Sequence, residues 1–243
     1  MSSTDTPSGF SQYGEDLILW EFFRGKVDGF FVDVGANHPT ALSNTWFFEQ
    51  RGWRGILVEP IPERAGQLRA ARPASRVVET ALGAPEQRGQ AVFKLAEEDV
   101  LSGLNPSARV KCSGEITVRV VTLDDVLNES GNPRVDFVSI DVEGTELEVL
   151  RGFDLARHQP KVLLVEDHWR QPVHQHLCAH GYKIVRRTGC NSWYVPRAAE
   201  VFPGTPAEAR RLGFYLWWRL PLRLFRLRLK ERLRAGFNRA RPA

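Results

Sequence analysis

The stretch GFFVDVGANHPT, residues 29–40, decides the fold, because an apolar run ends there abruptly in a carboxylate and a glycine. Runs rich in Phe and Val are typical of a strand that is buried on both faces of a sheet. Gly35 lets the backbone come close to a ligand, and Asp33 places a hydrogen-bond acceptor two positions before it. The stretch therefore predicts a binding loop at the carboxyl end of a buried strand.

Apolar runs alternate with helical patterns along most of the chain. The runs predict strands near 29–34, 55–59, 76–81, 135–141 and 161–166, and the helical patterns lie near 11–24, 42–52, 61–72, 145–152 and 172–180. Continuous apolar strands followed by helices are typical of a mostly parallel sheet that is covered on both faces. We therefore expect a doubly wound α/β domain.

Two further pairs of extended segments depart from this alternation. Residues 91–97 and 116–121 predict a side hairpin or a cover loop. Residues 181–187 and 191–197 are separated by only Thr-Gly-Cys, which is too short for a parallel crossover. We expect this second pair to lie antiparallel at one end of the sheet.

Composition and the positions of Pro and Gly predict how the chain is divided into segments. The chain begins with no apolar leader, contains no apolar run long enough to span a membrane, and has three widely spaced cysteines without a CxxC pair. We expect a cytoplasmic protein with structural thiols. The boundaries predicted from Pro and Gly positions are a flexible N-terminus over 1–10, one domain over 11–203 and a basic tail over 204–243.

A second acid follows the next predicted strand. Glu59 lies 24 residues after Gly35, where such folds hold an acid for the ribose hydroxyls of a nucleoside. The first loop lacks the G-x-G-x-x-G pattern that a pyrophosphate needs, which favours S-adenosylmethionine over NAD. The alternative is that Asp33 and Glu59 only cap loops and helix N-termini.

Five segments, in their order and spacing, resemble the FkbM family of S-adenosylmethionine-dependent methyltransferases. They are FVDVGANHP (31–39), VEP (58–60), VVTLDDVL (120–127), DFVSIDVEGTELEVLRGF (136–153) and LLVEDH (163–168). The segment SQYGEDL (11–17) resembles the lead-in of one branch of the family. The resemblance implies a Rossmann-like class I methyltransferase fold with seven strands, the last antiparallel, and methylation mostly of oxygen on sugars or secondary metabolites.

The resemblance also implies cofactor contacts, position by position. It places Asp33, Gly35 and Asn37 around the methionine part of the cofactor. It places Glu59 on the ribose, and Ala81 with Leu82, in the loop after the third strand, along the adenine. Residues 11–13 are expected to close over the cofactor or the substrate.

The segment SIDVEGTE (139–146) delivers a second set of acids at a strand end. We predict His168 as the general base, because its ordinary pKa is near 6.5, with Asp141 or Glu143 as its orienting partner or as a hydrogen-bond acceptor for a substrate hydroxyl. A second interpretation makes Asp141, Glu166 and His168 ligands of a divalent cation. In a third, His168 only completes a hydrogen bond at the end of its strand.

The segment PVHQHLCAHGY (172–182) has the histidines and the cysteine of a zinc site, but its spacing is typical of an amphipathic helix. We expect Val173 and Leu177 to face inward and the histidines to face solvent. Asn191 either reaches the site or serves as a turn residue in the terminal hairpin.

The end of the chain has a different character from the body. Residues 207–243 contain eleven Lys/Arg and two acids, a net charge of +9, whereas the whole chain carries +4. At helical spacing the cations fall in a stripe of Arg219, Arg223, Arg226, Lys230 and Arg234, preceded by aromatic side chains. This pattern favours contact of residues 214–241 with an anionic membrane surface over a nucleic-acid arm, and a helix docked on a second subunit is the other alternative.

Taken together, these features predict an O-methyltransferase that acts on a sugar hydroxyl of a glycolipid or lipid-linked glycan. Methylation of a soluble secondary metabolite is the rival among enzymes. A membrane-associated binding protein without catalytic activity is the rival from another class.

Overall fold

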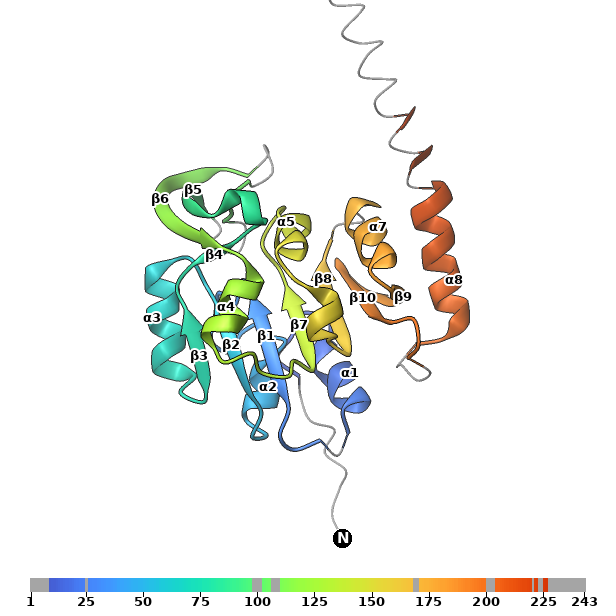
Figure 1. Cartoon of the computed structure of the whole chain (residues 1–243), viewed down its shortest axis with the longest axis horizontal. Coiled ribbons are helices and arrows are strands. Elements are labelled where there is room, and N and C mark those ends of the chain that lie inside the picture. Colours follow the sequence, from blue (N-terminus) through green and yellow to red (C-terminus); the bar gives the residue numbers. More distant parts are fainter. Residues whose placement is uncertain are drawn as a thin grey trace, which may run out of the picture.

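A seven-stranded sheet, in the order β3-β2-β1-β7-β8-β10-β9, forms the centre of the fold. The computed structural model describes residues 9–24, 26–97, 102–105, 110–167, 171–199, 204–219, 221–222 and 225–226 (Figure 1). The strands are β1 (Phe30–Val34), β2 (Arg54–Val58), β3 (Ser75–Val78), β7 (Phe137–Ile140), β8 (Val162–Glu166), β9 (Tyr182–Thr188) and β10 (Asn191–Pro196).

Neighbouring strands are parallel except around β10, which is antiparallel to both β8 and β9. This confirms the seven-stranded class I methyltransferase sheet with an antiparallel last strand. The chain order reverses direction between β1 and β7, so a crevice is expected beyond the carboxyl ends of these two strands.

Helices cover both faces of the sheet. The helices are α1 (Glu15–Phe22), α2 (Trp46–Glu49), α3 (Pro62–Ala71), α4 (Leu123–Glu129), α5 (Glu146–Arg151), α6 (Leu155–His158), α7 (Gln171–Ala179) and α8 (Pro206–Phe214), with a 3₁₀ turn at Pro85–Gln87 and a π-helical turn at Tyr215–Arg219. In β1, Phe31 packs in the core cluster that contains residues of α1, α2 and α3, whereas Val32 and Val34 pack in the cluster that contains residues of α4 to α7. Because side chains on both faces of β1 are buried, the strand sequence is one continuous apolar run.

A second, three-stranded sheet has the order β4-β6-β5 and consists of β4 (Ala81–Leu82), β5 (Gly89–Ala96) and β6 (Cys112–Val121). β5 and β6 pair antiparallel, which confirms the side hairpin. Figure 1 shows this sheet on the side of the molecule where α5 follows β7. It therefore lies at the carboxyl edge of the main sheet.

Local chemistry explains three differences from the predicted elements. The strand expected over 76–81 divides into β3 and β4, because the buried Thr80 hydroxyl donates to the Arg119 carbonyl oxygen at 2.8 Å and β4 pairs with β6 instead. The helix expected over 42–52 is reduced to α2, since Leu42 has a left-handed backbone with φ of +59°. The unexpected helix α4 begins at a capping box formed by Thr122 and Asp125.

The expected tail begins as part of the body. α8 lies along β9, and Leu216 is fully buried in the main core (Figure 1). Arg223, Lys230 and Arg234 lie outside the described residues, so most of the predicted basic stripe is not placed. In the part of the chain that the structure describes, no helix combines the length and apolar character needed to cross a bilayer.

Candidate active site

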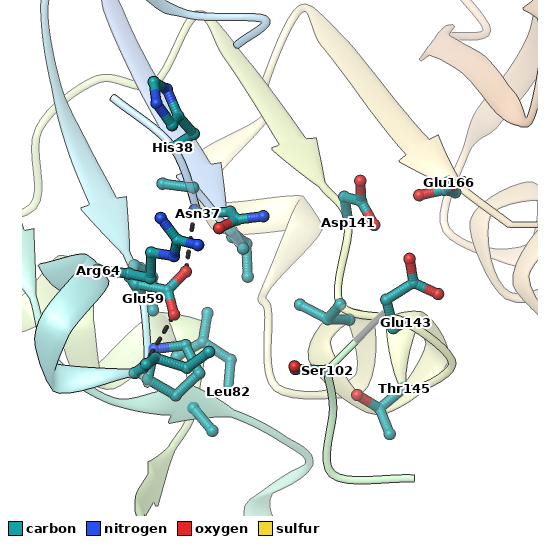
Figure 2. A pocket seen from close by; sticks show the side chains of 18 of the residues that line it. Asn37, His38, Glu59, Arg64, Leu82, Ser102, Asp141, Glu143, Thr145 and Glu166 are labelled. Carbon is teal, nitrogen blue, oxygen red and sulfur yellow. Dashed lines mark hydrogen bonds between the residues drawn. The ribbon is translucent and has the colours of Figure 1, made fainter. Parts of the chain in front are cut away.

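A cavity of about 440 Å³ opens at the carboxyl edge of the main sheet (Figure 2). This size is within the usual range for a small-molecule site. It is lined from the strand ends, from the three-stranded sheet and from the segment before α1. The lining includes Gln12, Gly35, Asn37, Leu42, Asn44, Glu59, Ile61, Arg64, Thr80, Ala81, Leu82, Phe93, Ser102, Leu104, Asp141, Glu143, Thr145, Glu166 and Asn191.

Gly35 forms the tightest point of the first loop. Its φ is +84°, and a Cβ at this position would overlap the backbone carbonyl oxygen of Asp141. The N–H groups of Gly35 and Ala36 both donate to the Val58 carbonyl oxygen, at 2.9 and 3.1 Å. Any larger residue at Gly35 would therefore separate the loops after β1 and β7.

Backbone conformations that are rare for residues other than glycine gather around the cavity. Asn37, Leu42 and Glu143 have φ values of +46°, +59° and +52°, and all three line it. Such conformations cost about 1–3 kcal/mol each and persist where the surrounding structure holds them. Their concentration here is typical of a functional site.

Glu59 shapes the first loop and lines the cavity as well. Its Oε2 accepts the Asn37 N–H and its Oε1 accepts the Ile61 N–H, both at 2.9 Å. Burial raises its pKa, which the two backbone donors and nearby Arg64 partly offset. Glu59 thus caps the loop, as the alternative interpretation of the sequence expects, and it also lines the cavity, as the cofactor interpretation expects.

Asp33 has other partners. Its side chain is 7% exposed and is absent from the described lining of the cavity. Its carboxylate accepts the Thr45 hydroxyl at 2.7 Å, and the Thr45 hydroxyl accepts an N–H of the buried Arg72 at 3.2 Å.

Arg72 connects Asp33 to a wider buried network. It also donates to Glu49 at 2.5 Å and to the Pro39 carbonyl oxygen at 3.0 Å. Burial raises the pKa of Asp33, against the effects of Thr45 and Arg72. The network holds the loop after β1 from behind, and sequence reasoning missed Arg72.

Three carboxylates meet on the other side of the cavity. Figure 2 shows Asp141, Glu143 and Glu166 across from Glu59 and Arg64. One carboxylate oxygen from each of Asp141, Glu143 and Glu166 lies within 4.8 Å of the other two. The Asp141 side chain is exposed within the cavity. Desolvation by the surrounding protein, a hydrogen bond with Glu166 and the charges of Glu166 and Glu143 raise its pKa above the usual range.

This arrangement can take up a proton or hold a cation. A carboxyl group with a raised pKa is a suitable general base near neutral pH. Three carboxylate oxygens at this spacing also suit a divalent cation. His168 lies outside the described residues, so the structure does not place the predicted base, and Glu143 occupies the position in the cluster that the metal interpretation gave to His168.

The remaining predicted residues divide between the cavity and the core. Ala81 and Leu82 line the cavity from β4, as the adenine interpretation requires, and Asn191 lines it from β10. His174 was expected in solvent but is 3% exposed. It lies on the inner face of α7, with Nδ1 3.4 Å from the Tyr194 hydroxyl, because both α5 and β9 pack against that helix.

Three features of the cavity are compatible with S-adenosylmethionine. Bare backbone at Gly35 permits close approach of a ligand, and the buried carboxylate of Glu59 lines the cavity. No pyrophosphate cradle of several glycines follows β1. These features match a nucleoside without phosphates.

Comparisons with known proteins agree with this assignment. Over 162 residues the chain is 28% identical to the hexuronic acid methyltransferase AglP of Haloferax volcanii, a match that covers 63% of this chain and 62% of that protein. The chain therefore spans less than two thirds of the length of this relative. Residues 33–184 match the methyltransferase FkbM domain.

Solved structures show weaker likeness. A TehB-like S-adenosylmethionine-dependent methyltransferase from Corynebacterium glutamicum is 9% identical with a TM-score of 0.41, covering 76% of this chain and 89% of that one. The O-methyltransferase from Bacillus cereus, in complex with S-adenosylhomocysteine, is 13% identical with a TM-score of 0.40, covering 75% and 80%. Scores this low add nothing to the fold that the strand order defines. From the domain match, the chain belongs to the FkbM methyltransferase family, for which S-adenosylmethionine is the implied cofactor.

Proposed function

We propose that the protein transfers a methyl group from S-adenosylmethionine to a hydroxyl of a sugar, in a glycolipid or lipid-linked glycan. The observation that carries the proposal is the division of one cavity into two sides. Glu59 and Arg64 lie on one side, the three carboxylates lie on the other, and Gly35 lies against the Asp141 backbone between them.

The cofactor side binds and orients the methyl donor. When bound, S-adenosylmethionine supplies an electrophilic methyl group on a sulfonium. In the proposal Gly35 and Asn37 lie along its methionine part, Glu59 accepts from its ribose, and Ala81 with Leu82 lines its adenine. Asp33 acts indirectly, by holding the loop through Thr45.

The acceptor side removes the proton of the attacking hydroxyl. Asp141 is the group that we assign to this step, because its carboxylate lines the cavity beside those of Glu143 and Glu166 and its pKa is raised above the usual range. A hydrogen bond with Glu166 and the charges of Glu166 and Glu143 contribute to that raised pKa. His168, the base predicted from the sequence, remains an alternative.

The charge of the acceptor side favours a hydroxyl over a carboxylate as the methylated group. Among the described lining residues, Arg64 is the one Lys or Arg, and it lies beside Glu59 on the opposite side (Figure 2). A substrate carboxylate next to Asp141 and Glu166 would meet like charges at short range. The name of the Haloferax relative supports a sugar acceptor, and the acidic side chains of this site favour a hydroxyl over a carboxylate on such an acceptor.

A metal-assisted form of the same reaction is favoured by one observation, the close approach of the carboxylate oxygens of Asp141, Glu143 and Glu166. A divalent cation held by these side chains would lower the pKa of the substrate hydroxyl.

We further propose that the end of the chain contacts an anionic membrane surface at the cytoplasmic side. Trp218 is 70% exposed and Phe225 is 65% exposed, and both lie among arginines. Aromatic and cationic side chains in this combination are typical of interfacial segments. Figure 1 shows the end of α8 on the same side of the molecule as α5 and α7, the carboxyl edge that carries the cavity.

Calorimetric binding of S-adenosylhomocysteine tests the cofactor site. Gly35→Ala should abolish binding, because its Cβ would overlap the Asp141 carbonyl oxygen, whereas Gly66→Ala has open space and serves as the matched control. NAD should not bind to the wild type. Equal binding by Gly35→Ala and Gly66→Ala would overturn the assignment.

Methyl transfer from labelled S-adenosylmethionine to extracted glycolipids tests the acceptor class. Label in a methyl ether of a sugar supports the proposal, and label only in soluble metabolites favours the enzymatic rival. Binding of S-adenosylhomocysteine with no transfer to any extract favours the non-catalytic rival. Sedimentation with anionic vesicles, compared between the wild type and Trp217→Ala/Trp218→Ala, tests the membrane contact.

A further inference from the structure

The segment before α1 is built into the cavity wall. Ser11 forms a parallel bridge with Leu42, which lines the cavity from the loop after β1. The Tyr13 ring lies against Gly189 in the turn between β9 and β10, where a Cβ would overlap it. The segment therefore joins the loop after β1 to the turn of the terminal hairpin.

Glu15 anchors this segment. Its side chain is 0% exposed, although Glu rarely lies fully inside a protein. Its Oε1 accepts the Thr188 hydroxyl at 2.7 Å and the Asn191 amide at 3.0 Å, and its Oε2 accepts the Tyr13 N–H at 2.8 Å. One buried carboxylate thus ties the segment to both strands of the terminal hairpin.

Asn191 carries this contact into the cavity. It is buried, pairs in register with Glu166 of β8, and lines the cavity. Its amide nitrogen donates to Glu15, which fixes the orientation of its side chain. Glu15 is therefore one residue away from the acceptor side, and it acts there through Asn191.

Gln12 lies between the bridge at Ser11 and the anchor at Glu15. It is exposed, lines the cavity, and makes no hydrogen bond within the described part of the chain. A carboxamide both donates and accepts, which suits the hydroxyl groups of an uncharged sugar. Asn44 and Asn191 add two further carboxamides to the same lining. The alternative is that the segment only packs the start of α1, which would leave Gln12 without a role.

We propose that Gln12 contacts the acceptor directly as a specificity-determining residue for an uncharged, hydroxyl-rich ring, and that Glu15 is a positioning residue that holds Gln12 and Asn191 against it. This inference rests on the proposed function. It assigns the N-terminal segment to the acceptor and not to the cofactor.

Gln12→Ala tests the direct contact. The probe is a glycolipid extract, with the half-saturating amount taken as the measure of acceptor binding. Loss of one hydrogen bond should raise that amount by about tenfold, with the maximal rate and the affinity for S-adenosylhomocysteine changed by less than about twofold. Gln175→Ala, an exposed glutamine on α7 outside the cavity lining, is the matched control. Equal half-saturating amounts for the two variants would overturn the contact.

Glu15→Gln tests the positioning role. The amide nitrogen cannot accept, so either Tyr13 or the pair of Thr188 and Asn191 loses its partner. We expect a higher half-saturating amount of extract with unchanged cofactor affinity. The effects of Glu15→Gln and Asn191→Ala should be less than additive in the double variant, since both break one contact. Full additivity, or no effect beyond that of the exposed control Glu21→Gln, would overturn the role.

The activity of the wild type distinguishes a failure of the proposed function from a failure of the roles assigned to Gln12 and Glu15. A wild type that binds S-adenosylhomocysteine but methylates no glycan would overturn the proposed function together with this inference. An active wild type whose Gln12→Ala variant is unchanged would overturn the inference alone. If Glu15→Gln does not fold, the exposed Gln12 still decides the contact, because its side chain supports no described part of the fold.

Discussion

The two sides of the cavity are held by different kinds of contact. On the cofactor side, Gly35, Asn37 and Glu59 are fixed through backbone N–H groups within two adjacent loops. On the acceptor side, side chains from the end of β7, from β8 and β10, and from the segment before α1 meet in the cavity. The first arrangement depends on two neighbouring loops, whereas the second depends on elements that are far apart in the sequence.

The largest expected effect comes from the acceptor side. Asp141→Asn removes the proposed base and should lower turnover by about 10²–10⁴-fold, the usual contribution of general base catalysis. Binding of S-adenosylhomocysteine should persist, because the cofactor side keeps its backbone bonds. Steady-state kinetics and calorimetry measure the two quantities, with Asp28→Asn, an exposed acid, as the control. Unchanged turnover would transfer the role of base to another group, with His168 the first to test.

The next largest effect is a loss of stability in the buried network that supports the loop after β1. Arg72→Ala leaves the buried carboxylate of Glu49 without its 2.5 Å partner and should lower the free energy of unfolding by about 3–5 kcal/mol. Arg69, whose ion pair with Glu79 is about half exposed, is the matched control, and its change to Ala should cost less than about 1 kcal/mol. Urea unfolding measures both. A similar small loss for the two variants would show that the loop after β1 does not depend on the buried network.

This network also shows where sequence reasoning stops. The end of β1, Glu59 and Asp141 could be predicted because an apolar run followed by an acid is a local signal. Arg72 could not, since it lies 39 positions after Asp33 and no local pattern marks an arginine as buried. The same limit applies to Asp33, which has the right strand position for a cofactor ligand but turns to Thr45.

Helix faces are equally hard to predict when several elements pack on one helix. α7 reads as amphipathic, and Val173 and Leu177 do face inward as expected. His174 joins them because α7 has neighbours on more than one side, including β9 and the π-helical turn, which single-helix periodicity cannot reveal. The role of Glu15 could not be predicted from a local pattern, because its partners Thr188 and Asn191 lie on a hairpin more than 170 positions away.

A smaller effect is expected in the pH dependence of the free energy of unfolding. The loop after β1 is held by the buried ion pair of Arg72 with Glu49, whereas α7 carries buried His174, whose pKa is lowered by burial. Below the unfolded value of about 6.5 the unfolded chain binds a proton that folded His174 refuses, so stability falls as pH falls, by at most about 1.4 kcal/mol per unit. His174→Gln should flatten part of this slope in urea unfolding between about pH 7.5 and 5.5. The lowered pKa values of His158 and His176 act in the same direction, whereas the raised pKa values of Asp33, Glu59 and Asp141 act in the opposite one. Identical slopes in the wild type and the variant would exclude His174 as a source.

The smallest expected effect concerns the metal. If Asp141 acts as a base by itself, treatment with EDTA should leave methyl transfer unchanged, because the proton passes directly to the carboxylate. If the three carboxylates hold a divalent cation, EDTA should abolish transfer and added Mg²⁺ should restore it, with Glu143→Gln weakening that restoration while Glu63→Gln, an exposed control, does not. Both roles need an ionised carboxylate at rest, because a base must be free to take up a proton and a metal ligand must have lost one. The hydrogen bond between Asp141 and Glu166 and the raised pKa of Asp141 oppose full ionisation of the cluster, whereas a bound cation would favour it, so the response to EDTA distinguishes the two mechanisms.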